Sequence, residues 1–271
     1  MSKDFKITPL WPGGLQRAVT FSYDDGRIFD RRLVEILNRH GLKGTFNLNS
    51  GLLGSEGKYV EASEIRDLYA GHEVAVHTVT HPFPRSLHYE NLLWEFVEDR
   101  RRLENLMGCV IKGCAYPFTD FNDRVVEVLR VAGIEYARTA FSHGGFHVPD
   151  DWLRWHPTCH DKAVDENLLN KFFSSRWAQR DRLLYIWGHS YEFEEQGRWE
   201  SIEKICNWIG NRAGEFWAAT NGEIYSYCKA WEGLRFTVDC KRVENPSALA
   251  VWLKWNDGIF CVNPAESVFF S

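Results

Sequence analysis

Short apolar segments alternate with amphipathic stretches along most of this chain, and this alternation constrains the fold more than any other feature. The apolar segments are typical of buried strands, and they cover residues 18–21, 43–48, 73–76, 109–116, 134–137, 183–187 and 216–219. Helical spacing of apolar residues predicts helices over residues 28–37, 61–69, 89–107, 122–131, 164–177, 201–212 and 222–228. Repeated strand–helix units imply a parallel sheet, which either closes as a barrel or stays open and doubly wound.

Polar side chains follow several of the predicted strands. They are Asp24, Asp25, His77, His81, Tyr116, Arg138 and His189. In a barrel the carboxyl ends of the strands converge on one face, where barrel enzymes place their active sites. No G-x-G-x-x-G motif follows a strand, so a dinucleotide-binding fold has little support. The chain is therefore predicted to form a distorted (β/α) barrel of about seven strands.

The pattern changes after Trp231. Residues 234–238, 249–253 and 259–262 resemble short strands separated by turn residues, and an Asp-Gly pair at 257–258 is typical of a hairpin. We therefore expect residues 1–228 to form the barrel. Residues 229–271 are expected to form a small antiparallel β appendage packed on it.

Composition narrows the classes of partner and compartment. The net charge of −5 gives no electrostatic reason to expect a nucleic-acid partner. No run approaches the ~18 apolar residues of a membrane span, and the first residues lack the apolar core of a signal peptide. Seven cysteines without a C-x-x-C pair argue against a disulfide framework. A cytoplasmic protein with no membrane span is predicted, and its oligomeric state stays open.

Two histidines and two carboxylates have the spacing of a metal site. His77 and His81 are four residues apart, so on one helical turn both rings point the same way and can share an ion. Asp25 would give a third, oxygen ligand and leave Asp24 free to act as a base. Two imidazoles, one carboxylate and an open position describe a hydrolytic zinc site, and they also suit iron or cobalt. The histidine spacing alone favours a pair of histidines in a polar loop, because histidines four residues apart are common.

Two of these motifs together resemble the polysaccharide deacetylase superfamily, the NodB-homology carbohydrate esterases. The segment Thr20-Phe21-Ser22-Tyr23-Asp24-Asp25-Gly26 is similar to the family's (T/S)F(D)DG motif with one extra residue, and His77-Thr78-Val79-Thr80-His81 matches its H(S/T)xxH motif. The resemblance covers about residues 17 to 225. It implies that Asp24 is the general base. It also implies that Asp25, His77 and His81 bind one divalent ion, zinc foremost, with cobalt, nickel or iron as options.

The family's third motif is only partly matched, by residues 115–119. The resemblance implies that Tyr116 offers its backbone N–H to an oxyanion and that Pro117 helps to form the substrate pocket. Thr119 replaces the usual glycine, and the motif's arginine, which steadies the base, is missing from this stretch. Arg138 can replace it by pairing with Asp24, although a purely structural ion pair fits the sequence as well.

The later part of the chain supplies the remaining candidates. His189 resembles the family's late histidine, which implies a general acid. Residues 139–161 lack periodicity and are expected to form a functional loop. Within it, Asp150-Asp151-Trp152 resembles the fourth motif, in which an acid and a tryptophan support the late histidine. His160 is either a further pocket residue or a bystander.

The resemblance implies a metal-dependent hydrolase that removes an acetyl group from an N- or O-acetylated saccharide. Two alternatives stay open. One is hydrolysis of another C–N bond, such as that of a cyclic amide. The other is a non-catalytic barrel that binds a glycan through its C-terminal strands or some of its twelve tryptophans.

Overall fold

A curled parallel sheet organises the chain in the computed structural model, which describes residues 7–174 and 182–270. The strand order is β6–β5–β4–β3–β2–β8–β7, and β9 pairs with the beginning of β2. The strands are β2 (Arg17–Asp25), β3 (Gly44–Leu48), β4 (Glu73–Val76), β5 (Gly113–Ala115), β6 (Tyr136–Arg138), β7 (Cys159–His160), β8 (Arg182–His189) and β9 (Trp217–Ala218). Every pairing between them is parallel, which confirms the predicted α/β class.

An extended segment between β6 and β7 links the two edges of this sheet. Arg138 at the end of β6 forms a parallel bridge with Trp155. Three residues later, the N–H of Thr158 donates to the carbonyl of Tyr185 in β8 at 2.9 Å. The sheet therefore curls into a distorted barrel, as predicted.

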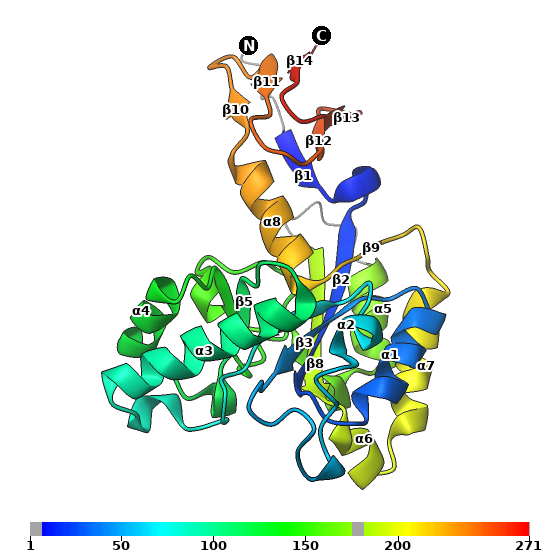
Figure 1. Cartoon of the computed structure of the whole chain (residues 1–271). Coiled ribbons are helices and arrows are strands. Elements are labelled where there is room, and N and C mark those ends of the chain that lie inside the picture. The colour runs from blue at the N-terminus through cyan, green and yellow to red at the C-terminus, as the bar shows by residue number, and fades with distance from the viewer. Residues whose placement is uncertain (1–6, 175–181, 271) are drawn as a thin grey trace.

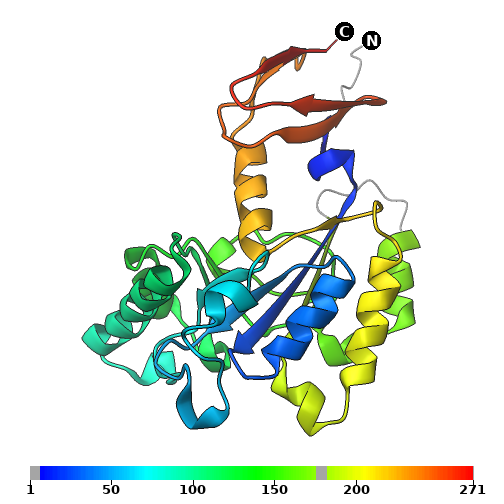
Figure 2. The ribbon, with the colours of Figure 1, turned by 45° about the vertical axis from the view of Figure 1, so that its right-hand side comes forward.

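Helices cover the outside of the sheet, with α1 and α7 together on one side and α3 and α4 on the other (Figures 1 and 2). They are α1 (Asp30–Arg39), α2 (Ile65–Leu68), α3 (Tyr89–Met107), α4 (Asp123–Val131), α5 (Glu166–Ser174), α6 (Tyr191–Glu195), α7 (Trp199–Gly210) and α8 (Asn221–Glu232). The bounds of α3 match the prediction, whereas residues 175–177 of the predicted helix 164–177 lie outside the described residues. Within residues 7–174 and 182–270, no helix has both the length and the apolar character needed to cross a bilayer.

The main core lies between the sheet and these helices. Its fully buried side chains from β2, α1 and β3 include Phe21, Tyr23, Leu33, Leu37, Phe46 and Leu48. Burying one such apolar side chain contributes roughly 1.5–3 kcal/mol. This packing fixes the strands, and therefore the positions of the residues at their carboxyl ends.

A small β appendage stands at the far end of α8 (Figure 1). One antiparallel sheet joins β1 (Ile7–Leu10), β12 (Val251–Trp255) and β13 (Gly258–Val262), and another joins β10 (Arg235–Phe236), β11 (Arg242–Glu244) and β14 (Ser267–Phe269). The predicted hairpin forms between β12 and β13, although its two turn residues are Asn256 and Asp257. Because β1 comes from the other end of the chain and α8 runs across residue 228, the division at that residue stays a prediction.

Candidate active site

The carboxyl ends of the parallel strands bring most of the predicted site residues to one edge. In the sheet register, Asp24 on β2 lies opposite Asn47 on β3 and His189 on β8. His77 directly follows β4, and Arg138 ends β6. His160 ends β7. The prediction that these strand-end residues converge is therefore confirmed.

Asp25, His77 and His81 form a group that can hold a metal ion. The Oδ1 atom of Asp25 lies 3.5 Å from Nε2 of His77 and 3.5 Å from Nε2 of His81. The three ligand atoms all lie within 4.8 Å of one another. Ligand atoms bound at about 2.1 Å around a tetrahedral ion are about 3.4 Å apart. The group therefore fits a single divalent ion.

Hydrogen bonding and charge prepare both imidazoles for this role. His77 is buried, and its Nδ1 lies 2.8 Å from the carbonyl oxygen of Ala115, so Nδ1–H donates and Nε2 faces Asp25. Burial and the neighbouring charge of His77 lower the pKa of His81 to about 4, which keeps that ring neutral at pH 7. Burial would lower the pKa of His77, but Asp24 and Asp25 raise it above its usual value. This concentration of negative charge favours a cation.

The two histidines converge by a bend, not by a helical turn. Residues 77–81 form no helix, and Thr78 and His81 have φ angles of +70° and +58°. The left-handed region costs a non-glycine residue roughly 1–2 kcal/mol, which surrounding contacts must offset. The ring centroids lie 4.9 Å apart. The predicted convergence is therefore right, whereas the helical turn offered as its cause is wrong.

Buried polar side chains anchor the 77–81 loop. The Asn49 side chain donates to the carbonyl of His77 at 2.5 Å, and Asp99 accepts from the His77 N–H at 3.0 Å. Glu95 accepts from the N–H of Thr80 at 2.9 Å and from its hydroxyl at 2.6 Å. The sequence analysis missed these anchors. Two acidic residues on the buried face of a helix were the available signal, because such residues are rarely buried without partners.

Asp24 is held beside this group as a buried, charged carboxylate. Its Oδ1 accepts from the Asn47 side chain at 2.9 Å, and its Oδ2 pairs with the guanidinium of Arg138. Burial would raise the pKa of Asp24, but Arg138, with His77 and His189, holds it below its usual value. The guanidinium of Arg138 also lies over the Trp187 ring, 4.7 Å from its centroid. The predicted pairing of Arg138 with Asp24 is therefore present.

His189 lies on the other side of Asp24, between two carboxylates. Its Nε2 is 3.9 Å from Oδ2 of Asp24, and its Nδ1 is 3.4 Å from Oε1 of Glu192 on α6. Burial would lower the pKa of His189, but Glu192 and Asp24 raise it. Glu192 also pairs with Lys162 at 2.9 Å and Arg198 at 3.2 Å. Sequence reasoning missed Glu192, which lies on a short helix without apolar periodicity.

His160 approaches the same glutamate. Its Nε2 is 3.4 Å from Oε2 of Glu192, and its ring centroid is 6.5 Å from that of His189. His160, His189 and Glu192 therefore form a second group whose possible ligand atoms lie within 4.8 Å of one another. Because Lys162 and Arg198 already neutralise the glutamate, this group fits a cation less well than the one around Asp25.

Two predicted residues, Tyr116 and Trp152, are engaged elsewhere, and Pro117 is buried. The N–H of Tyr116 donates to the carbonyl of Arg138 at 3.0 Å, so it is not available to an oxyanion in this structure. Trp152 is 7% exposed and packs against Trp155 and Tyr225 in a second apolar cluster, which also contains Leu183 of β8 and Ile224 of α8. The acid that faces His189 is Glu192, and not an acid next to Trp152 as the fourth-motif resemblance implied.

An exposed pair of aromatic rings adjoins the metal-ligand group. Phe83 and Phe118 are each 56% exposed, and their rings stack with centroids 4.0 Å apart. The Phe118 ring also makes an edge-to-face contact with the His81 ring, and the two centroids lie 4.5 Å apart. Phe118 has a φ of +55°, so its ring is presented from a strained backbone. We call Phe83 and Phe118 the aromatic platform.

Comparison with known proteins shows which proteins this chain resembles. The family model described as Polysaccharide deacetylase matches residues 14–137. Chitin deacetylase 1 from Cryptococcus neoformans var. grubii is 25% identical over 137 residues, which are 50% of this chain and 28% of that protein. The chain thus spans about a quarter of the curated relative it matches. Over residues 14–137 the chain is therefore similar to polysaccharide deacetylases.

Solved structures share the fold. A candidate polysaccharide deacetylase from Mycobacterium smegmatis has a TM-score of 0.62 at 18% identity, over 83% of this chain and 94% of that one. The Xyl-CE4 domain of a multidomain xylanase from the hindgut metagenome of Trinervitermes trinervoides has a TM-score of 0.55 at 18% identity, over 79% and 92% of the two chains. At these identities the likeness shows a common fold alone.

Proposed function

We propose that this chain is a metal-dependent hydrolase that removes an acetyl group from an N- or O-acetylated saccharide. The observation that carries the proposal is a buried, ionised Asp24 beside Asp25, His77 and His81. Metal-assisted hydrolysis requires at least a base next to a group that can hold a divalent cation. The similarity of residues 14–137 to polysaccharide deacetylases supports an acetylated saccharide as the substrate.

Asp25, His77 and His81 would hold the ion. Two imidazoles and one carboxylate suit zinc best, and cobalt, nickel and iron are compatible with the same donors. When bound, such an ion supplies Lewis-acid chemistry, because it polarises a carbonyl group and makes water more acidic.

The remaining residues of the site would move protons. Asp24 takes a proton from the attacking water, and Asn47 and Arg138 hold its two oxygens in position. His189, whose raised pKa favours the imidazolium, gives a proton to the departing amine or alkoxide. Glu192 stabilises that imidazolium through Nδ1. Each such proton transfer typically contributes about 10²–10⁴-fold to the rate.

Release of acetate tests this proposal. The purified chain, supplied with zinc or cobalt, is incubated with acetylated mono- and oligosaccharides and, in parallel, with cyclic amides. We expect free acetate from at least one acetylated sugar and no opening of the amide rings. Ring opening without acetate release would favour the cyclic-amide alternative, and turnover of neither class would contradict the proposal.

Replacement of Glu192 by glutamine is expected to move the alkaline limb of the pH profile of kcat/KM to lower pH. His189 must be protonated to act as an acid, so activity falls as pH rises through its pKa. The Glu192 carboxylate raises that pKa, so its loss should lower it. Glu195→Gln, a change on the exposed part of the same helix, is the control and should leave the profile in place. An unmoved limb in Glu192→Gln would show that Glu192 does not act on His189.

The aromatic platform is expected to bind a sugar ring of the substrate. Phe118→Ala should raise KM for acetylated oligosaccharides by roughly tenfold with little change in kcat, because a stacking contact is made equally in the ground and transition states. Phe118→Gly should show the same KM but a higher melting temperature than Phe118→Ala, since glycine adopts a φ of +55° without strain. Phe269→Ala, on the appendage and 69% exposed, is the control. An unchanged KM in both Phe118 variants would remove the platform from the substrate site.

A further inference from the structure

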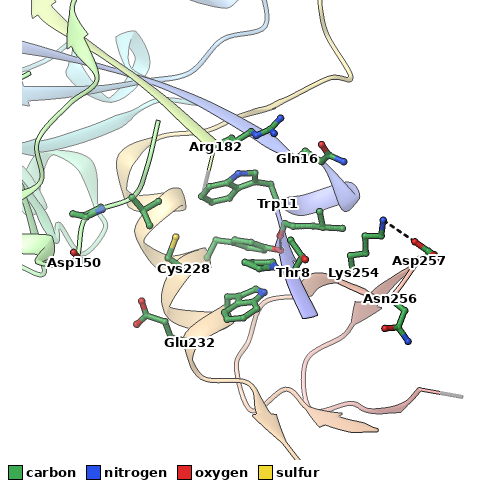
Figure 3. A pocket seen from close by; sticks show the side chains of 16 residues that line it. Thr8, Trp11, Gln16, Asp150, Arg182, Cys228, Glu232, Lys254, Asn256 and Asp257 are labelled. Carbon is green, nitrogen blue, oxygen red and sulfur yellow. Dashed lines mark hydrogen bonds and ion pairs between the residues drawn. The ribbon is translucent and has the colours of Figure 1, made fainter. Parts of the chain in front are cut away.

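A cavity of about 500 Å³ lies where the barrel meets the appendage (Figure 3). Its walls come from β1, α8, the turn between β12 and β13, and the beginning of β8. Arg182 at the first position of β8 lines it, whereas His189 at the last position belongs to the candidate active site. At about 3.3 Å per residue, these two positions are roughly 23 Å apart. The cavity is therefore separate from the site proposed for hydrolysis.

One wall of the cavity is aromatic and well fixed. It contains Trp11, Tyr227 and Trp231. The rings of Trp11 and Tyr227 lie 5.8 Å apart. The Tyr227 hydroxyl donates to the carbonyl of Leu10 at 2.7 Å and accepts from the N–H of Trp252 at 2.9 Å. These bonds tie α8 to both β1 and β12, so the wall is formed before any ligand arrives.

The rim of the cavity is polar and carries charges of both signs. Figure 3 shows Asp150 and Glu232 on one side of Trp11, and Lys254 and Asp257 on the other. The Nζ atom of Lys254 is already paired with Asp257 at 3.7 Å. The described lining holds two cations, Arg182 and Lys254, against three carboxylates, Asp150, Glu232 and Asp257. This balance does not favour a phosphate or carboxylate ligand, which converging cations would recognise.

The amides of two further lining residues add hydrogen-bonding groups without charge. Gln16 and Asn256 are both exposed and both line the cavity. Carboxylates accept and amides both donate and accept, which matches a ligand that carries many hydroxyl groups. The volume lies within the ~300–1,000 Å³ range of small-molecule sites.

We propose that this cavity is a non-catalytic binding site for a neutral oligosaccharide. The apolar face of a sugar ring packs on Trp231, and Trp11 and Tyr227, which are 5% and 4% exposed, support that wall from behind. Rim carboxylates and amides bind the hydroxyls. The proposal depends on no step of the hydrolysis proposed above.

Calorimetric titration of the full chain with cellotetraose and with xylotetraose tests the site. These sugars carry no acetyl group, so a deacetylase cannot consume them. We expect binding by the unmodified chain and roughly tenfold weaker binding by Trp231→Ala, the loss typical of a central aromatic contact. Gln16→Ala, at an exposed position that is safe for folding, should also weaken binding. Trp94→Ala, which removes a 47% exposed tryptophan on α3 away from the cavity, should bind as the unmodified chain does.

Two further measurements separate this site from the candidate active site. Trp231→Ala should release acetate from a small acetylated sugar at the unmodified rate. His81→Ala should still bind the tetrasaccharides. Absence of binding to either sugar, equal binding by the unmodified chain and both cavity variants, or loss of binding in His81→Ala would each overturn the proposal.

Discussion

Asp24→Asn is expected to lower the rate of acetate release by about 10²–10⁴-fold, the contribution of a general base, while metal content stays unchanged. Asparagine keeps the shape of the side chain and can still accept from Asn47, but it cannot take a proton from water. Asp25, His77 and His81 remain in place to hold the ion. The measurement is kcat on the best substrate of the acetate panel, with metal content determined by mass spectrometry on the same sample.

A stability effect accompanies this change and must be controlled. Arg138 is 2% exposed, and it would lose the carboxylate that compensates its charge. Removing one partner of a buried ion pair costs about 3–5 kcal/mol, so kcat should be measured well below the melting temperature of the variant. Asp123→Asn breaks an exposed pair with Arg154 and should leave both activity and stability near those of the unmodified chain. If Asp24→Asn turned over at a nearly normal rate, another group would have to be the base.

His77→Ala and His81→Ala are each expected to reduce the metal content from about one ion per chain to nearly none. Each replacement removes one of only three protein ligands. The loss of affinity should exceed the ~10–100-fold that follows from changes to residues behind the ligands. Metal analysis after gel filtration, together with titration of added zinc, measures the effect.

Replacement of a histidine outside the proposed metal site is the control for this result. His147 is exposed and lies in the 139–158 segment outside both candidate ligand groups, so His147→Ala should keep its ion. His160→Ala should keep it as well, because Lys162 already neutralises Glu192 in that second group. Retention of the ion in His77→Ala and His81→Ala, with loss in His160→Ala, would move the metal centre to His160, His189 and Glu192.

Features that depend on neighbouring residues were predictable from the sequence. The bounds of α3 follow from apolar residues at helical spacing, and Leu92, Phe96 and Leu103 are indeed buried. Asn122 caps α4 as predicted, because its side chain accepts from the N–H of Val125 at 3.1 Å. The strand-end positions of Asp24 and His77 were likewise visible, since each follows a short apolar run. The order of neighbouring residues was therefore enough to predict most of the barrel and the residues proposed as principal metal ligands.

Features that depend on distant contacts were not predictable in the same way. Glu192 reaches His189 from α6, a helix of five residues that shows no apolar repeat. A tryptophan such as Trp152 can stack on a sugar or fill an apolar core, and the sequence does not distinguish the two. The packing of Trp155 and Tyr225 against it shows that it belongs to the core. The oxyanion role given to the Tyr116 N–H failed because its hydrogen bond goes to β6, which no motif reveals.

The pairing between the two ends of the chain could not be predicted from the sequence either. The β1 strand is short, and its partner β12 lies more than two hundred residues away in sequence. Neither strand carries a signal for the other, because antiparallel partners are chosen by packing as well as by propensity. The cavity proposed to bind an oligosaccharide exists only because this pairing and α8 bring β1 and the appendage together.

Anomalous diffraction at the zinc absorption edge, from crystals of the unmodified chain grown with zinc, tests the central claim most directly. We predict a single strong peak about 2 Å from Oδ1 of Asp25 and from Nε2 of His77 and His81, with Asp24 outside bonding distance. A peak among His160, His189 and Glu192 instead, or no peak at either group, would contradict this account.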